Sequence, residues 1–195
     1  MTNTVPAVNF YRQRIWQEME PLLRELGPLN SALDFGSGDG WFTFQLQSLV
    51  PGIRAIEVQE RPGALFEPEI YPGGPLPFPD REFELVTALD VMHHCPQPKE
   101  QLAQLLRVCG RFFVLKDHTY STPLGRWSLG VLDNIGNRKF GIPVRYRYQR
   151  GHEWARVFHS SGFSLRQRVH PLPVHPASRA WAINAFELLE VWERA

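Results

Sequence analysis

Leu33-Asp-Phe-Gly-Ser-Gly-Asp-Gly40 is the stretch that decides the fold of this 195-residue chain. A short apolar run, Ser31-Ala-Leu-Asp-Phe35, leads into the glycines, and helical spacing follows over residues 40–50. A turn between a strand and a helix is a common place for a ligand in α/β proteins. Gly36 and Gly38 allow a tight turn and let a ligand approach the backbone with no Cβ in the way.

An acidic side chain follows the turn at the distance that a ribose-binding site needs. Glu57 lies near the end of a second predicted strand, Ile53-Arg-Ala-Ile-Glu-Val58, 21 positions after Gly36. A carboxylate there can accept two hydrogen bonds from the vicinal hydroxyls of a ribose. A glycine turn alone can be a turn without a ligand, but this context favours a nucleotide-like ligand.

The rest of the chain predicts strands that alternate with helices. Further helices are predicted over 8–26, about 102–109 and 151–161, and further strands near 69–71 and over 83–89, 111–115, 163–170 and 182–191. Pro21 predicts a kink in the first helix or its division into two, and Gly110 predicts a helix end. The pattern predicts a single domain, residues 1–195, with a doubly wound α/β sheet, helices on both faces and an antiparallel last strand.

Composition excludes several classes of protein. The net charge is +1, so the chain as a whole does not attract polyanions, and the basic-aromatic quartet Arg145-Tyr-Arg-Tyr148 is too short to predict nucleic-acid binding. We find neither a signal peptide nor an apolar stretch that could cross a bilayer, and we expect a cytoplasmic protein without stable membrane insertion. No cluster of metal ligands is apparent, so we predict no metal.

Several motifs resemble those of a known family. Leu33–Gly40 resembles motif I of class I S-adenosylmethionine-dependent methyltransferases. Leu76-Pro-Phe-Pro-Asp80 with Phe83-Glu-Leu-Val86, then Val91-Met-His-His94 and Phe158-His-Ser-Ser-Gly-Phe163, resemble segments of the methyltransferase type 11 subfamily. The resemblance covers roughly residues 30 to 165. It implies a seven-stranded Rossmann-like methyltransferase sheet and S-adenosylmethionine as the cofactor.

The resemblance also implies which residues contact the cofactor. Asp34 would order the turn, and the contacts would come from Gly36, Ser37, Gly38, Glu57, Val58 and Asp90. By fold analogy the helical region 1–28 covers the cofactor, and Tyr11 contacts it. One departure concerns adenine: the subfamily has an acid just before the "LPF" segment, where this chain has Tyr71-Pro-Gly-Gly-Pro75.

Two histidines are candidates for a general base in methyl transfer. His94 follows the fourth strand and His118 follows the fifth, and histidine takes up a proton most readily near neutral pH. They favour a small molecule with an oxygen acceptor, while nitrogen and carbon stay open. Alternatively, His94 shapes its loop and His118 is an ordinary loop residue. Lys116 and Asp117 would neutralise each other.

The segment 118–150 is predicted to be an insertion that roofs the acceptor. It carries six basic side chains against the single acid Asp133 (the basic ones are Arg126, Arg138, Lys139, Arg145, Arg147 and Arg150). A lid over an anionic or amphiphilic small molecule would have this composition. A packed cap with solvated arginines would have it too.

Two other functions compete with methyl transfer. An NAD(P)-dependent oxidoreductase would carry G-x-G-x-x-G, but Trp41 stands where that fingerprint has its third glycine. A non-catalytic methyltransferase-fold module would bind the cofactor weakly or not at all, which the intact glycine turn and Glu57 disfavour.

Overall fold

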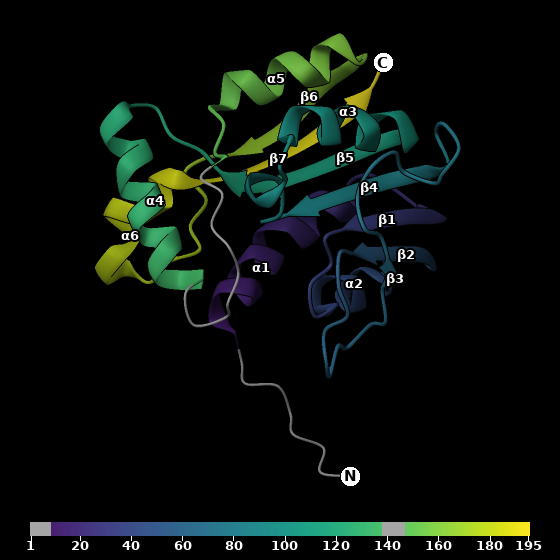
Figure 1. The fold of residues 1–195 in the computed structure, drawn as a ribbon, viewed down its shortest axis with the longest axis horizontal. Helices are drawn as coiled ribbons and strands as arrows, with labels where there is room; N and C mark the ends of the chain where they lie inside the picture. The colour runs from purple at the N-terminus through teal and green to yellow at the C-terminus, as the bar shows by residue number, and fades with distance from the viewer. Residues whose placement is uncertain (1–8, 138–146) are drawn as a thin grey trace.

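A mixed sheet of seven strands forms the centre of the protein. The computed structural model describes residues 9–137 and 147–195 (Figure 1). Its strands are β1 Ser31–Phe35, β2 Gly52–Glu57, β3 Glu69–Ile70, β4 Phe83–Leu89, β5 Cys109–His118, β6 Phe163–Val169 and β7 Glu187–Arg194. Their order across the sheet is β3-β2-β1-β4-β5-β7-β6. The predicted sheet with an antiparallel finish is confirmed.

The five strands β3, β2, β1, β4 and β5, which are neighbours in this order, are parallel to one another. Strand β7 runs antiparallel to both β5 and β6. The carboxyl ends of β1, β2, β4 and β5 therefore lie at one edge of the sheet, and β7 begins at that same edge. Figure 1 shows α4 and α6 at this end of β5 and β7. Ligands of open α/β sheets bind at this edge.

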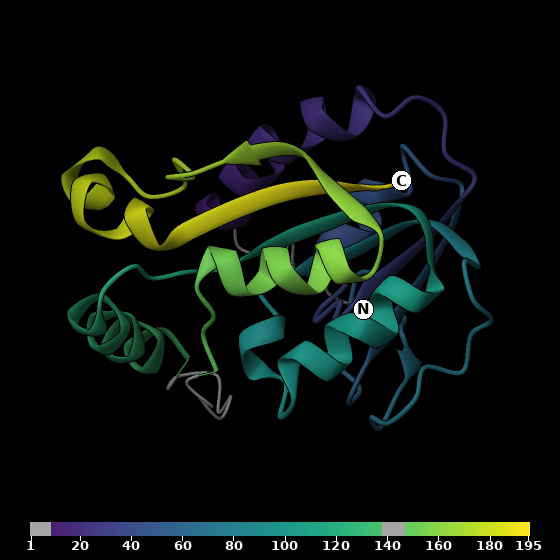
Figure 2. The ribbon, with the colours of Figure 1, turned by 90° about the horizontal axis from the view of Figure 1, so that it is seen from above.

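Helices cover both faces of the sheet, as predicted. The helices are α1 Phe10–Arg24, α2 Trp41–Leu46, α3 Pro98–Val108, α4 Pro123–Asn137, α5 Gly151–Ser160 and α6 Ala177–Ile183, with short 3₁₀ turns at Met92–His94 (η1) and Asn184–Phe186 (η3). One apolar cluster joins α1 and α2 to the sheet, and another joins α3 and α5 to the opposite face. Figure 2 shows α1 on one side of the sheet and α3 and α5 on the other.

The alternation of strand side chains explains why both clusters form. Neighbouring side chains of β5 point to opposite faces. Phe113 and Leu115 accordingly belong to the α3–α5 cluster, and Phe112 and Val114 belong to the α1–α2 cluster. An apolar run is thus what a strand covered on both faces requires.

Pro21 lies in the last turn of α1, which is a single helix, so of the two outcomes predicted for Pro21 the division of the helix is wrong. Two other predictions about element bounds are wrong as well. Gly110 does not end α3 but belongs to β5. The last strand begins at Glu187 and not at residue 182, because α6 and η3 precede it. None of the side chains of α6 is buried, so this helix leaves no periodic apolar pattern in the sequence.

The inserted segment contains α4, which follows β5 after a short turn. Three basic residues of the predicted lid lie outside the described residues, namely Arg138, Lys139 and Arg145. Across residues 9–137 and 147–195, no helix has both the length and the apolar character needed to span a bilayer.

Candidate functional site

The glycine turn between β1 and α2 has two differently packed glycines. Gly36 (φ 70°) and Gly38 (φ 60°) both adopt the left-handed conformation that favours glycine. A Cβ on Gly36 would lie 2.2 Å from Val91 Cγ2, whereas a Cβ on Gly38 would meet nothing within 4 Å. Val91 therefore fills the space that a side chain at Gly36 would need, whereas the space beside Gly38 is open.

Ser37 and Glu57 line the turn with polar atoms. Glu57 Oε2 accepts a hydrogen bond from the Gly38 amide (2.9 Å), and Oε1 accepts one from the Val58 amide (2.7 Å). Each carboxylate oxygen keeps lone-pair capacity for further donors. Ser37 Oγ is buried and has no hydrogen-bond partner among the residues that the structure describes. A buried polar atom of this kind needs a partner, and a bound ligand can supply one.

The Asp34 side chain connects the strand before the glycine turn to two neighbouring elements. Its side chain is buried and accepts hydrogen bonds from Thr43 Oγ1 (2.5 Å) and Thr87 Oγ1 (2.8 Å). Burial raises the pKa of Asp34, although the two hydroxyl donors act in the opposite direction. Asp34 thus joins β1 to α2 and β4, which agrees with the expected role of ordering the turn.

The first helix reaches the same turn. Arg12 of α1 forms a 2.5 Å ion pair with Asp39, which also accepts a hydrogen bond from the Trp41 amide (3.2 Å). Both side chains of the ion pair are partly exposed. The amino-terminal turn of α1 therefore lies against the loop that contains Gly38, as expected for a helix that covers a ligand there.

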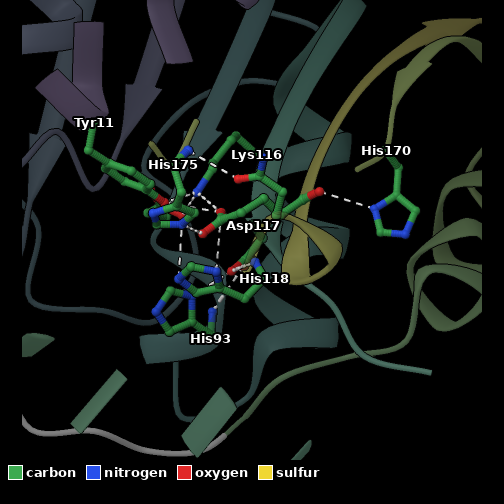
Figure 3. Close-up of polar contacts among 10 residues, drawn as sticks. Tyr11, His93, Lys116, Asp117, His118, His170 and His175 are labelled. Atoms are coloured by element: carbon green, nitrogen blue, oxygen red, sulfur yellow. Dashed lines mark hydrogen bonds and ion pairs between the residues drawn. The ribbon is translucent and has the colours of Figure 1, made fainter. Parts of the chain in front are cut away.

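A buried ion cluster lies next to this turn, at the carboxyl ends of β4 and β5 (Figure 3). Lys116 Nζ is fully buried, forms an ion pair with Asp90 and lies 2.7 Å from Glu187 Oε2. It also hydrogen-bonds the Tyr11 hydroxyl. Burial by itself lowers the pKa of Lys116, but the charges of Asp90 and Glu187 outweigh it and raise that pKa. Lys116 is therefore a cation.

Tyr11 and His175 complete the cluster around Glu187. The Tyr11 hydroxyl lies 3.1 Å from Glu187 Oε2 and 3.2 Å from Asp90 Oδ2. Burial, followed by these two negative charges, raises the pKa of Tyr11 well above its usual value, so its hydroxyl stays protonated. His175 Nε2 lies 2.9 Å from Glu187 Oε1. The cluster thus connects α1, two strands and the loop before α6.

His118 lies between two carboxylates. Its Nδ1 is 3.4 Å from Glu187 Oε2, and its Nε2 is 3.9 Å from Asp90 Oδ1. Burial lowers the pKa of His118, but the Glu187 charge and then that of Asp90 more than compensate and raise it to about 9. At neutral pH His118 is therefore an imidazolium, which cannot accept a proton. This geometry does not support its predicted role as a base.

Asp117 pairs with His93 and not with Lys116. Adjacent residues of β5 face opposite sides of the sheet, so the prediction that Lys116 and Asp117 neutralise each other is wrong. Asp117 Oδ1 lies 2.5 Å from His93 Nδ1, and both side chains are buried. Burial raises the pKa of Asp117, but His93 outweighs it and lowers that pKa.

The second histidine after β4 lies at the edge of this group. His94 is partly exposed, and its ring centroid is 4.0 Å from that of His93. Val58 is 61% exposed and directly follows the last residue of β2. His94 and Val58 thus both present surface at the carboxyl edge of the sheet.

Three side chains of the cluster have the composition of a metal site. Asp90, His118 and Glu187 offer ligand atoms that lie within 4.8 Å of one another. The Lys116 ammonium already bonds both carboxylates, so a cation in the same place would have to displace it. The described residues therefore give no support to a metal here, and its absence stays a prediction.

Sequence reasoning missed three residues of this site: Glu187, His175 and His93. Glu187 had a detectable signal, since it is an acid at the start of the apolar run Leu188-Leu-Glu-Val-Trp192. A buried acid needs a partner, and that could have been noted. His175 lies in a proline-rich loop without a pattern. His93 was passed over for its neighbour His94.

Comparison with known proteins places the chain in a family. A family model described as a methyltransferase domain matches residues 9–168. An uncharacterized methyltransferase of Mycobacterium avium (strain 104) is 26% identical over 151 residues, which cover 68% of this chain and 56% of the relative. The chain spans about half the length of the curated relatives that it matches.

Solved structures share the fold. An S-adenosylmethionine dependent methyltransferase from Mesorhizobium loti has a TM-score of 0.67 and 13% identity, covering 95% of this chain and 100% of that chain. The magnesium protoporphyrin IX methyltransferase from Synechocystis PCC 6803, solved with bound SAH, has a TM-score of 0.61 and 17% identity, covering 96% and 88% respectively. Identities this low show likeness of fold alone.

Proposed function

Because the chain belongs to the methyltransferase-domain family, we propose that it transfers a methyl group from S-adenosylmethionine to an oxygen atom of a small molecule. One observation supports the cofactor assignment. The open space beside Gly38 lies between the Glu57 carboxylate and the buried Ser37 Oγ, which has no hydrogen-bond partner in the described part of the chain. This set of polar atoms fits an adenosyl ligand with a charged amino-acid end.

The residues of the turn have distinct roles in this proposal. The Gly38 and Ser37 segment holds the methionine end of the cofactor, and Asp90 lies beside it. Glu57 accepts hydrogen bonds from the ribose hydroxyls. The exposed Val58 side chain offers adenine an apolar surface in place of the acid that the type 11 subfamily has before "LPF". Membership of that subfamily is part of the same proposal, since it rests on the motifs alone.

The neighbouring structures support this cofactor. The Mesorhizobium loti protein is called S-adenosylmethionine dependent, and the Synechocystis protein was solved with SAH. A nicotinamide cofactor is disfavoured by Trp41, at the start of α2, where the dinucleotide fingerprint has a glycine. A non-catalytic module is disfavoured because Glu57 and the turn keep their geometry.

The acceptor lies over the carboxyl ends of β4 and β5, where His94 and His118 meet the ion cluster. The cofactor brings an activated methyl group, so the protein mainly aligns the two reactants. The His118 imidazolium, flanked by Asp90 and Glu187, stabilises an acceptor oxygen that is already ionised, such as a carboxylate or a phenolate. For a neutral hydroxyl, His94 takes the proton. Tyr11, whose hydroxyl lies 3.2 Å from Asp90, contacts the cofactor from α1.

Calorimetric titration tests the cofactor assignment. Wild-type protein is titrated with S-adenosylmethionine, S-adenosylhomocysteine and NAD(H), and the titrations are repeated on Glu57→Ala and on the matched control Glu60→Ala, an exposed acid three residues further on. We expect micromolar binding of the two adenosyl ligands, weakened by Glu57→Ala alone. Binding of NAD(H) alone would indicate an oxidoreductase, and binding of none would favour the non-catalytic module.

A further inference from the structure

A polar cavity lies at the base of the inserted segment. Its volume is about 280 Å³, and its wall includes Tyr120 and Ser121, which precede α4, and Arg150 to His152, at the start of α5. Thr119 Oγ1 donates a hydrogen bond to the Gln149 carbonyl (3.2 Å), which joins the two ends of the insertion here. The cavity begins one residue beyond His118.

The cavity wall is basic. Arg150, Arg168, His152 and His170 all line it, and none of the described residues of the wall is acidic. Arg168 is neutralised by the fully buried Glu190, at 2.6 Å. The nearby Glu153 carboxylate already has partners. It accepts a hydrogen bond from the Arg150 amide (2.9 Å) at the start of α5, and it lies 3.4 Å from Lys99 Nζ.

Of the two arginines in the described part of the cavity wall, Arg150 is the one without an ion pair. Within residues 9–137 and 147–195 its guanidinium makes neither an ion pair nor a hydrogen bond, although its Nε is buried. It lies 5.5 Å from the Tyr120 ring centroid, a cation–π contact that fixes its position. A buried guanidinium N–H without an acceptor is costly, so a bound anion would satisfy it.

The amino end of α5 adds backbone donors to the same cavity. Gly151 and His152 are the first two residues of this ten-residue helix, and both line the cavity. The first amides of a helix have no acceptor within the helix, and the helix dipole favours negative charge there. Helix amides and an unpaired arginine are a combination that recognises oxyanions.

We propose that this cavity binds an oxyanion, a phosphate or a carboxylate group, and that the group belongs to the methyl acceptor. The second part rests on the proposed function, because it places the anchoring group of the acceptor beside His118 at the root of the insertion. The shared chemistry is a compact anion with several acceptor oxygens. Arg150 and the α5 amides bind it, and Arg168 and the two histidines border it.

Anion binding is tested on purified protein with inorganic phosphate, phenyl phosphate and benzoate. The variant is Arg150→Gln, and the matched control is Arg156→Gln, which removes the same charge from an exposed position of the same helix. Arg168 is left unchanged because its removal would strand the buried Glu190. We expect Arg150→Gln to weaken binding of at least one probe by about tenfold, the effect of one charge-assisted contact, and Arg156→Gln to leave it unchanged.

The probes and a parallel titration with S-adenosylhomocysteine separate the outcomes. Preference for phenyl phosphate over benzoate identifies a phosphate group, and the reverse identifies a carboxylate. Absence of binding, or equal weakening in both variants, would overturn the anion site even if S-adenosylhomocysteine binds. Arg150-dependent anion binding without S-adenosylhomocysteine binding would keep the anion site and overturn its assignment to a methyl acceptor.

Discussion

Lys116 Nζ and Glu187 Oε2 lie 2.7 Å apart in the interior of the protein, on strands that are 71 positions apart in the sequence. Neither side chain is appreciably exposed. Asp90 shares the same ammonium, so Lys116 and the neighbouring His118 imidazolium balance two carboxylates beside the proposed acceptor position. Stability and the proposed function therefore involve the same residues.

Removing the Lys116 charge should destabilise the fold strongly. Lys116→Met leaves Glu187 buried next to Asp90, and we expect the free energy of unfolding to fall by about 3–5 kcal/mol. Lys99→Met is the control, because Lys99 forms an exposed pair with Glu153 whose loss should cost less than about 1 kcal/mol. The measurement is unfolding in urea. Equal losses in the two variants would contradict a structural role for the buried cluster.

Two alanine substitutions in the glycine turn should separate packing from ligand binding. Both Gly36→Ala and Gly38→Ala incur the left-handed strain of about 1–2 kcal/mol. Only Gly36→Ala also overlaps Val91, which we expect to add about 1–3 kcal/mol. Gly38→Ala should instead weaken S-adenosylhomocysteine binding more than it lowers stability.

The control for this pair is the double variant Gly36→Ala/Val91→Ala. In the Val91→Ala background, Gly36→Ala should lower the free energy of unfolding by less than it does in the wild-type background, where Val91 is present. If Gly36→Ala and Gly38→Ala proved equally stable in thermal and urea unfolding, the overlap with Val91 would not matter.

His118 should make stability depend on pH. Its pKa is raised from 6.5 to about 9 in the folded protein, so its contribution is complete below pH 6.5 and is lost as pH rises through 9. We expect the unfolding free energy of wild type relative to His118→Asn to decrease over this window by up to about 3 kcal/mol. Comparison with the variant removes the contributions of other groups, such as Cys109, whose pKa burial raises to about 12. A flat difference from pH 6 to 10 would show that His118 is not ion-paired.

His94 should matter for turnover and not for cofactor binding. With a hydroxyl acceptor found by screening small molecules with labelled S-adenosylmethionine, His94→Ala should lower kcat by about 10²–10⁴-fold. Its affinity for S-adenosylhomocysteine should not change. His159→Ala, on the exposed side of α5, is the control. A kcat within threefold of wild type would remove His94 as the base.

Much of the fold could be predicted from the sequence, because its signals are local. Strands β1, β2, β4 and β5 appear as apolar runs within a few residues of their observed bounds, and β3 and β6 were also predicted close to theirs. Prediction failed where burial leaves no pattern: α6 contains no buried side chain. It also failed at Gly110, which was taken as a helix end although the β5 strand includes it.

The sequence by itself determined the glycine turn and its acid. Gly38 and Glu57 belong to two adjacent βα units, and that short-range arrangement fixes their meeting at the strand ends. Only the tertiary structure decided the partners of Lys116, Asp117 and Arg150. Their contacts depend on the β5–β7 register, which sets Lys116 opposite Leu189 and His118 opposite Glu187, and on where the insertion returns to the sheet. Such long-range pairings arise only when the core closes, because no local pattern encodes which distant charge a buried side chain meets.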